Sequence, residues 1–231
     1  MLLAIDTATQ NISVALHDGA ELFYEQTWRS VNRHTVELAP AVEQMLLRLG
    51  DAPLSAVAVA IGPGTYSGLR VGVSFAKAVA SARGLPLVGV TTLDILASAQ
   101  PHFQGGLVAV VQAGRTRVIA ASYQWRRGRW VTRVEPQTMD WETLLNTIDG
   151  PALISGEIDA DARARLAQAR LDGMPITPVP AAVRLRRAGF LAEEAWLRLR
   201  AGLGDELDGA DAAAFDPARI VPVYAKTKDS P

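Results

Sequence analysis

The first half of the chain opens with a strand-like distribution of apolar residues and then changes to a helical one. Residues 2–6 form an apolar run that ends at Asp6, positions 12, 14 and 16 are apolar, and residues 22–27 follow a hairpin signal at Asp18-Gly19. This pattern predicts three antiparallel strands. From Val36 to Leu49 the apolar spacing becomes three and four residues, which predicts a helix. Pro40 should kink that helix or mark its first turn.

The remaining pattern predicts alternating strands and helices, arranged in two halves. Strands are expected over residues 56–61, 87–90, 107–111, 117–123 and 129–134, and helices over residues 67–83, 92–99, 141–147, 160–169 and 183–200. The turn-rich segment 101–106 is the best boundary. We therefore expect an α/β protein with a first lobe over residues 1–101 and a smaller second lobe over residues 102–231, whose last helix could pack back on the first lobe.

Composition excludes several classes of protein. The 231 residues include no Cys and three His, and the formal charge is -1. Disulfides, thiolate catalysis and Cys-ligated metals are therefore excluded, and there is no basic surplus of the kind that nucleic-acid-binding proteins usually carry. No apolar run approaches the length of a membrane helix. We expect a cytoplasmic protein with no membrane partner.

A cluster of short polar side chains follows the first predicted strand. Asp6, Thr7 and Thr9 lie in the turn between the first two strands. Backbone N–H groups of such turns can bind phosphate. The same side chains can instead satisfy the backbone of their own hairpin. The sequence leaves both interpretations open.

A glycine-rich segment, residues 62–72, joins a buried strand to a helix. It matches neither the phosphate-loop nor the dinucleotide-loop pattern. Gly68, Gly72, Ala76 and Ala80 recur every four residues and form one stripe on the helix. Such a stripe allows close packing, either inside the same domain or against a helix across a subunit interface, and both remain open.

Arginine and aromatic residues are interleaved in the second half. Arg126, Arg127 and Arg129 lie close to Trp125 and Trp130, while Arg115 and Arg117 precede them. Basic and aromatic side chains together can bind RNA. The segment also has the composition of a solvated hairpin tip, so both interpretations are kept.

The first half resembles the TsaB (YeaZ) family, an accessory subunit in the synthesis of threonylcarbamoyladenosine in tRNA. The matching segments are Ala4-Ile5-Asp6-Thr7-Ala8-Thr9, Arg33-His34-Thr35, and residues 62–72, Gly-Pro-Gly-Thr-Tyr-Ser-Gly-Leu-Arg-Val-Gly. The resemblance implies a two-lobed actin-like ATPase (ribonuclease H-like) fold, with a mixed sheet and flanking helices in each lobe. The second half matches loosely.

The resemblance also implies a degenerate copy of the catalytic subunit TsaD. Thr92 and Leu96 occupy the positions of the two His residues of that subunit's metal motif, and neither can replace imidazole. Gln112 stands where family members often have Asp, which makes a nucleotide or metal contact from that lobe more doubtful.

By this resemblance the chain is a non-catalytic scaffold with no metal site and no cofactor of its own. Its partners would be a TsaD-like catalytic subunit, a TsaE-like ATPase subunit and tRNA held by the complex, with a homodimer when the partner is absent. Asp6, Thr7 and Thr9 would form a vestigial phosphate loop. The implied partner-interface residues lie on the first two helices: His34, Leu38, Val42, Met45, Gly68, Gly72, Ala76 and Ala80.

Two other functions remain as alternatives. One is an autonomous actin-like ATPase or phosphotransferase, which needs a working phosphate site at Asp6. The other is a metalloprotease-like protein, which the shortage of metal ligands opposes.

Overall fold

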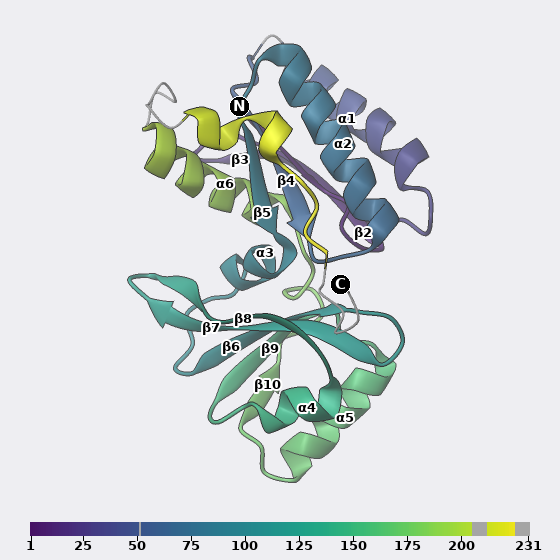
Figure 1. Ribbon diagram of the computed structural model, residues 1–231, viewed down its shortest axis with the longest axis vertical. Coiled ribbons are helices and arrows are strands. Elements are labelled where there is room, and N and C mark those ends of the chain that lie inside the picture. The colour runs from purple at the N-terminus through teal and green to yellow at the C-terminus, as the bar shows by residue number, and fades with distance from the viewer. Residues whose placement is uncertain (51, 205–211, 225–231) are drawn as a thin grey trace. The chain divides into compact units, whose positions relative to one another are not determined.

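The computed structural model describes residues 1–50, 52–204 and 212–224 (Figure 1). The chain divides into two compact units. The first unit comprises Met1–Thr92 and Arg187–Val223, and the second comprises residues 93–186 together with Tyr224. The boundary expected from composition, at residues 101/102, falls inside the second unit because the short helix before it packs there.

The first unit is built on a five-stranded mixed sheet in the order β3-β2-β1-β4-β5. β1 pairs antiparallel with β2, and β2 with β3, whereas β4 and β5 run parallel to β1. Both faces of β1 and β4 are covered, which explains why their sequences are apolar runs rather than alternating ones. The strands are β1 (Leu2–Asp6), β2 (Asn11–His17), β3 (Leu22–Arg29), β4 (Ala56–Gly62) and β5 (Leu87–Thr91).

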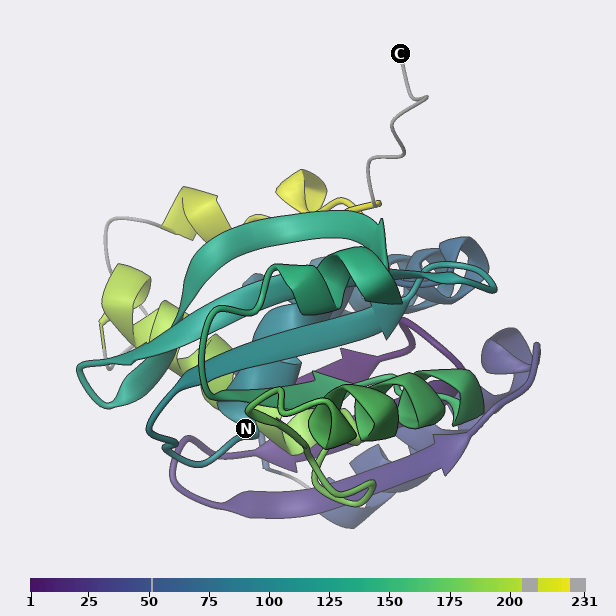
Figure 2. The same ribbon diagram turned by 90° about the horizontal axis from the view of Figure 1, so that it is seen from below.

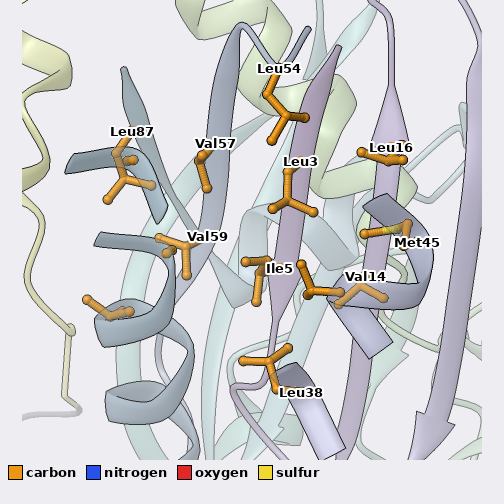
Figure 3. Packing of buried hydrophobic residues seen from close by; sticks show 14 of the residues in the cluster. Leu3, Ile5, Val14, Leu16, Leu38, Met45, Leu54, Val57, Val59 and Leu87 are labelled. Carbon is orange, nitrogen blue, oxygen red and sulfur yellow. The ribbon is translucent and has the colours of Figure 1, made fainter. Parts of the chain in front are cut away.

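Helices α1 (His34–Leu49) and α2 (Tyr66–Arg83) cover one face of this sheet. Leu38 and Met45 of α1 point onto Ile5 and Val14 of the strands (Figure 3). The helix runs unbroken past Pro40, so this proline does not mark its first turn.

Helix α6 (Ala188–Leu203) contacts β1 and β2, on the face opposite to α1 and α2. Because side chains alternate along β2, Ser13 and His17 point away from the α1 side. The Ala188 N–H donates to Ser13 Oγ at 2.7 Å. His17 Nδ1 accepts from the Gly19 N–H, so His17 Nε2 donates to Glu193 at 3.0 Å. These contacts attach α6, the last of the described α-helices, to the sheet of the first unit.

The second unit repeats the strand order as β10-β9-β6-β7-β8. β6, β7 and β8 are antiparallel, and β9 and β10 run parallel to β6. Helices α4 and α5 pack on one face and α3 on the other (Figures 1 and 2). The elements are α3 (Thr92–Ser98), β6 (Gly106–Gln112), β7 (Arg117–Arg126), β8 (Arg129–Asp140), α4 (Trp141–Asn146), β9 (Ala152–Gly156), α5 (Ala160–Leu171) and β10 (Ile176–Pro178); η1 (Ala212–Phe215) and η2 (Pro217–Arg219) are short 3-10 turns of the first unit.

Strands β9 and β10 have weak signals in the sequence. β9 has five residues, follows Pro151 and ends in a glycine with positive φ, and β10 has three residues that end in a proline. Such short runs next to turn-forming residues do not show a period of two.

Candidate functional site

The loop after β1 is closed by the start of α2. Thr7 Oγ donates to the carbonyl of Gly68 at 2.7 Å, and Asp6 Oδ1 accepts the N–H of Ala8 at 2.9 Å. The N–H of Thr65 donates to the carbonyl of Ala8 at 2.7 Å. Asp6, Thr7 and Thr9 are all buried. The Thr7 hydroxyl therefore bonds the backbone of α2, and the Asp6 carboxylate bonds the backbone of the loop.

Three glycines permit this close approach. A Cβ built at Gly64 would lie 2.2 Å from the carbonyl oxygen of Ala8. A Cβ at Gly68 would lie 2.2 Å from the carbonyl oxygen of Thr7, and one at Gly72 would lie 2.2 Å from Thr7 Oγ. Real Cβ atoms do not approach oxygen so closely, so no side chain fits at these positions.

The small-residue stripe of α2 therefore faces inward. Gly68 and Gly72 lie against Thr7, and Ala76 and Ala80 belong to the core of the first unit. Of the two interpretations of the stripe, the structure shows the internal one. As a correction to the expected partner interface, these four residues offer no surface to a second chain because their own sheet covers them.

The expected interface residues of α1 divide into core and anchor residues. Leu38, Val42 and Met45 are buried in the core. Half-buried His34 donates from Nε2 to the carbonyl of Thr9 at 2.7 Å, which fastens the start of α1 to the loop after β1. Met45 lies wholly in the core, whereas Leu38 and Val42 also line the space between α1 and α2 on their outer face, so a partner contact stays a prediction for these two.

An apolar groove runs along the outer face between α1 and α2. Leu38 and Val42 reach its floor, while exposed or half-exposed side chains form its walls. Leu47 is 77% exposed on its rim, and Glu43 and Arg83 add charge. The wall residues are Ala39, Pro40, Leu46 and Leu47 on α1, and Val71, Phe75, Ala78, Val79 and Ala82 on α2. The sequence did not predict these wall residues as an interface, because the small-residue stripe of α2 was taken as the contact surface. Phe75 and Val79 lie on the same helix but outside that stripe.

The positions of the two missing metal ligands are filled by packing and by a backbone contact. Thr92 is buried and donates from Oγ to the carbonyl of Pro63 at 2.6 Å. Leu96 is buried among the core residues of the second unit. Within residues 1–50, 52–204 and 212–224, no three His, Asp or Glu side chains gather as a metal-binding group, and no helix there is long and apolar enough to cross a membrane.

In the second unit, the loop after β6 is tied to the start of α5 by Gln112. The Gln112 N–H donates to Glu157 at 2.9 Å, and its side-chain amide donates to Asp159 at 2.6 Å. Two carboxylates therefore lie beside this loop. An anionic ligand such as phosphate would meet like charge there.

The arginines and aromatics of β7 and β8 are separated by the strand geometry. Arg117 and Arg126 lie at opposite ends of β7, about 30 Å apart at the rise of an extended strand. Trp130 is buried and donates from Nε1 to the carbonyl of Gln100 at 3.1 Å. Burial, and the Asp94 carboxylate to which the hydroxyl donates, raise the pKa of buried Tyr123. Tyr123 and Trp130 therefore belong to the core, and half-buried Trp125 packs against it.

Two sheets of this strand order, each with three antiparallel strands followed by two parallel ones, define a two-lobed protein of the actin-like (ribonuclease H-like) ATPase fold. A family model described as TsaD, tRNA N6-adenosine threonylcarbamoyltransferase, matches residues 29–171, more than half of the chain. The chain belongs to the TsaB (YeaZ) family, inside the wider family that this model describes.

Named relatives support this assignment. The tRNA threonylcarbamoyladenosine biosynthesis protein TsaB of Bacillus subtilis (strain 168) is 34% identical over 160 residues, which cover 67% of this chain and 70% of the relative. The TsaB of Escherichia coli (strain K12) is 35% identical over 129 residues, 53% of this chain and 54% of the relative. The structure of YeaZ from Pseudomonas aeruginosa shares the fold with a TM-score of 0.70 and 24% identity, over 96% of this chain and 98% of that one.

Proposed function

We propose that this chain is the non-catalytic scaffold subunit of the complex that adds threonylcarbamoyl to the adenosine beside the anticodon of tRNAs reading codons that start with A. Membership of the TsaB family supports a role in this pathway. The observation that carries the scaffold role is the closed loop after β1, in which the groups that could hold phosphate bond the protein itself.

The same observation counts against an autonomous ATPase. Thr7 Oγ and the Ala8 N–H, two donors that a phosphate would need, already have protein acceptors in the buried loop. A phosphate group there would have to replace these bonds and open the contact with Gly68. A metalloprotease is disfavoured by the donor set, since Thr92 and Leu96 supply no imidazole.

The groove between α1 and α2 is the surface we assign to the TsaD-like subunit. It offers an apolar floor, an aromatic wall residue in Phe75, and small residues at Ala39, Ala78 and Ala82 that let another helix approach closely. Exposed apolar patches rimmed by charge are typical of protein interfaces. In the absence of that partner, the same face closes a homodimer. A TsaE-like ATPase subunit joins the assembled complex, and this chain itself carries no cofactor.

Omission from a reconstituted reaction tests the function. Synthesis of threonylcarbamoyladenosine in tRNA is measured with the TsaD-like and TsaE-like subunits, in the presence and absence of this chain. We expect product to fall at least tenfold without the chain. Unchanged product would overturn the scaffold role.

Two exposed leucines allow a matched test of the surface. Leu47 is 77% exposed on the groove, and Leu171 is 81% exposed on α5 of the second unit. Leu47→Asp should weaken binding of the TsaD-like subunit by roughly tenfold or more, since burying an unpaired carboxylate is costly. Leu171→Asp should leave binding unchanged. Equal binding by both variants in a titration would show that the partner uses another face.

A further inference from the structure

A cavity of about 410 Å³ lies within the second unit, on the face of its sheet that α4 and α5 cover (Figure 1). Val108 of β6, Ala120 of β7 and Ala152 of β9 are buried and line it, and residues 147–151, which follow α4, form another wall. Two of the three buried positions carry only a methyl group, so the side chains leave the space open. Cavities of roughly this volume hold small molecules.

An irregularity in β8 brings an arginine to this cavity. Thr132 and Val134 of β8 pair with the consecutive residues Tyr123 and Ser122 of β7. Arg133 is therefore one residue in excess, as in a β-bulge, and bulges re-aim the side chains beside them. Arg133 and Val134 both line the cavity, although neighbouring side chains in a regular strand point to opposite faces. The departure from regular pairing thus supplies the cavity with a guanidinium group.

One pair of opposite charges stands at the opening of the cavity. Arg133 Nη2 donates to Asp149 Oδ2 at 3.1 Å, and the two side chains are 54% and 73% exposed. The Arg133 guanidinium lowers the pKa of the Asp149 carboxyl, so both groups are charged at neutral pH. Among the described residues that line the cavity, no others are charged. The cavity therefore combines an apolar interior with one cation and one anion side by side.

We infer that this cavity binds a free α-amino acid with a branched or aromatic apolar side chain. The apolar side chain fills the space over Val108 and Ala120, the carboxylate accepts from the Arg133 guanidinium, and the ammonium group donates to the Asp149 carboxylate. An α-amino acid carries its two charges on one carbon, so they lie close together, as the charges of Arg133 and Asp149 do. Because an exposed ion pair contributes little to stability, rearranging this pair around a ligand costs little.

An apolar side chain of a protein partner is the competing occupant of the cavity. It would cover the Arg133–Asp149 pair without supplying charges of its own, and removing an ion pair from water is costly. A ligand with only a carboxylate would place a like charge beside Asp149, and one with only an ammonium group would do so beside Arg133. A zwitterion with an apolar side chain matches both the interior and the two charges.

The test measures binding to the full chain by calorimetry, with probes that carry both charges or only one. L-Phenylalanine and L-leucine should bind with saturation, and 3-phenylpropanoate and phenethylamine, which each lack one charge, should bind about tenfold more weakly or less. Arg133→Gln should weaken binding of L-phenylalanine by about tenfold or more and leave that of phenethylamine unweakened. Asp149→Asn should also weaken L-phenylalanine but leave 3-phenylpropanoate unweakened. Both substitutions are at exposed side chains, so the variants should fold.

A second exposed ion pair of the same unit is the matched control. Arg165 and Asp161 of α5 are 51% and 68% exposed and do not line the cavity, so Asp161→Asn/Arg165→Gln should bind L-phenylalanine as the wild type does. No saturable binding of either amino acid at millimolar concentration, or equal weakening in the control, would overturn the inference. Weaker pairing of Arg133→Gln with the TsaD-like subunit, without amino-acid binding, would overturn it in favour of a protein partner. These results would leave the proposed function intact, because that function is tested separately by omitting the chain.

Discussion

The two sheets share a strand order, but the loop after the first strand of each sheet is buried in one unit and exposed in the other. After β1, the loop is buried and α2 reaches its backbone through Gly68 and Gly72. After β6, residues 114–117 are exposed, and a Cβ at Gly114 would meet no atom within 4 Å. The loop after β1 is closed by its steric fit against α2, whereas the loop after β6 is held by hydrogen bonds from Gln112 to two carboxylates.

This difference shows that the topology does not by itself make a phosphate site. In the first sheet the Thr7 hydroxyl and the Ala8 N–H of this strand-loop-strand unit donate to the protein itself, and in the second sheet the unit is flanked by acidic groups. The chemistry of a site is set by the side chains at the loop and at the facing helix start, and not by the fold.

The largest effect should come from adding a methyl group to the sealed loop. In Gly68→Ala the new Cβ would lie 2.2 Å from a backbone carbonyl oxygen that cannot rotate away. We expect a loss of about 3 kcal/mol in the free energy of unfolding, despite the better helix propensity of alanine. Chemical denaturation measures it. Gly150→Ala, which meets no atom within 4 Å, is the control and should change stability by less than about 0.5 kcal/mol.

A double mutant locates the clash in one atom. A Cβ at Gly72 meets Thr7 Oγ at 2.2 Å, but its next neighbour is 3.4 Å away. Thr7→Ala removes that oxygen, so the combined variant should lose less stability than the sum of the single changes, by roughly 1 kcal/mol. Gly68→Ala should show no such rescue by Thr7→Ala. If the stability losses of Gly72→Ala and Thr7→Ala simply add in the double mutant, α2 does not pack against the Thr7 side chain at Gly72.

An intermediate loss of stability is expected from a change in the loop after β6, because the interactions of that loop depend on charge and not on steric fit. Gln112→Asp places a third carboxylate beside Glu157 and Asp159 and removes the side-chain amide that donates to Asp159, while the backbone N–H that donates to Glu157 stays. We expect a loss of about 1 kcal/mol that shrinks as salt is added. Gln112→Ala should cost less and be insensitive to salt. If both variants respond alike to salt, like-charge repulsion does not govern this loop.

The smallest effect should appear as acid sensitivity confined to the second unit. Hydrogen bonds from Thr143 lower the pKa of Asp140, which caps α4. A lowered folded-state pKa stabilises the fold above the usual Asp pKa, and this contribution disappears as the pH falls through the folded value. The difference in melting temperature between wild type and Asp140→Ala should therefore be present at neutral pH and vanish in acid. Thr65→Ala, at the cap of α2, should lower stability independently of pH.

Much of this architecture could be predicted from the pattern of apolar residues. The spacing of Leu38, Val42 and Met45 is that of an inward helix face, and they lie inward. The sequence predicted the small-residue stripe on α2, but it did not predict whether the stripe faces its own sheet or a partner. A row of small residues packs equally well against a sheet and against a partner helix. Its neighbour Thr7 lies far away in sequence. The groove depends on how α1 and α2 lie side by side, which no local pattern reports.

The division of the first unit into two segments has a consequence for synthesis on the ribosome. The face of β1 and β2 that carries Ser13 and His17 is covered by α6, whose first residue is Ala188. All strands and helices of the second unit have been made before that point. The middle of the chain can therefore complete its fold before the beginning does, and the opening strands must wait with one apolar face uncovered. Chaperones that recognise nascent chains should engage this protein during that interval, and shortening it by circular permutation should reduce aggregation.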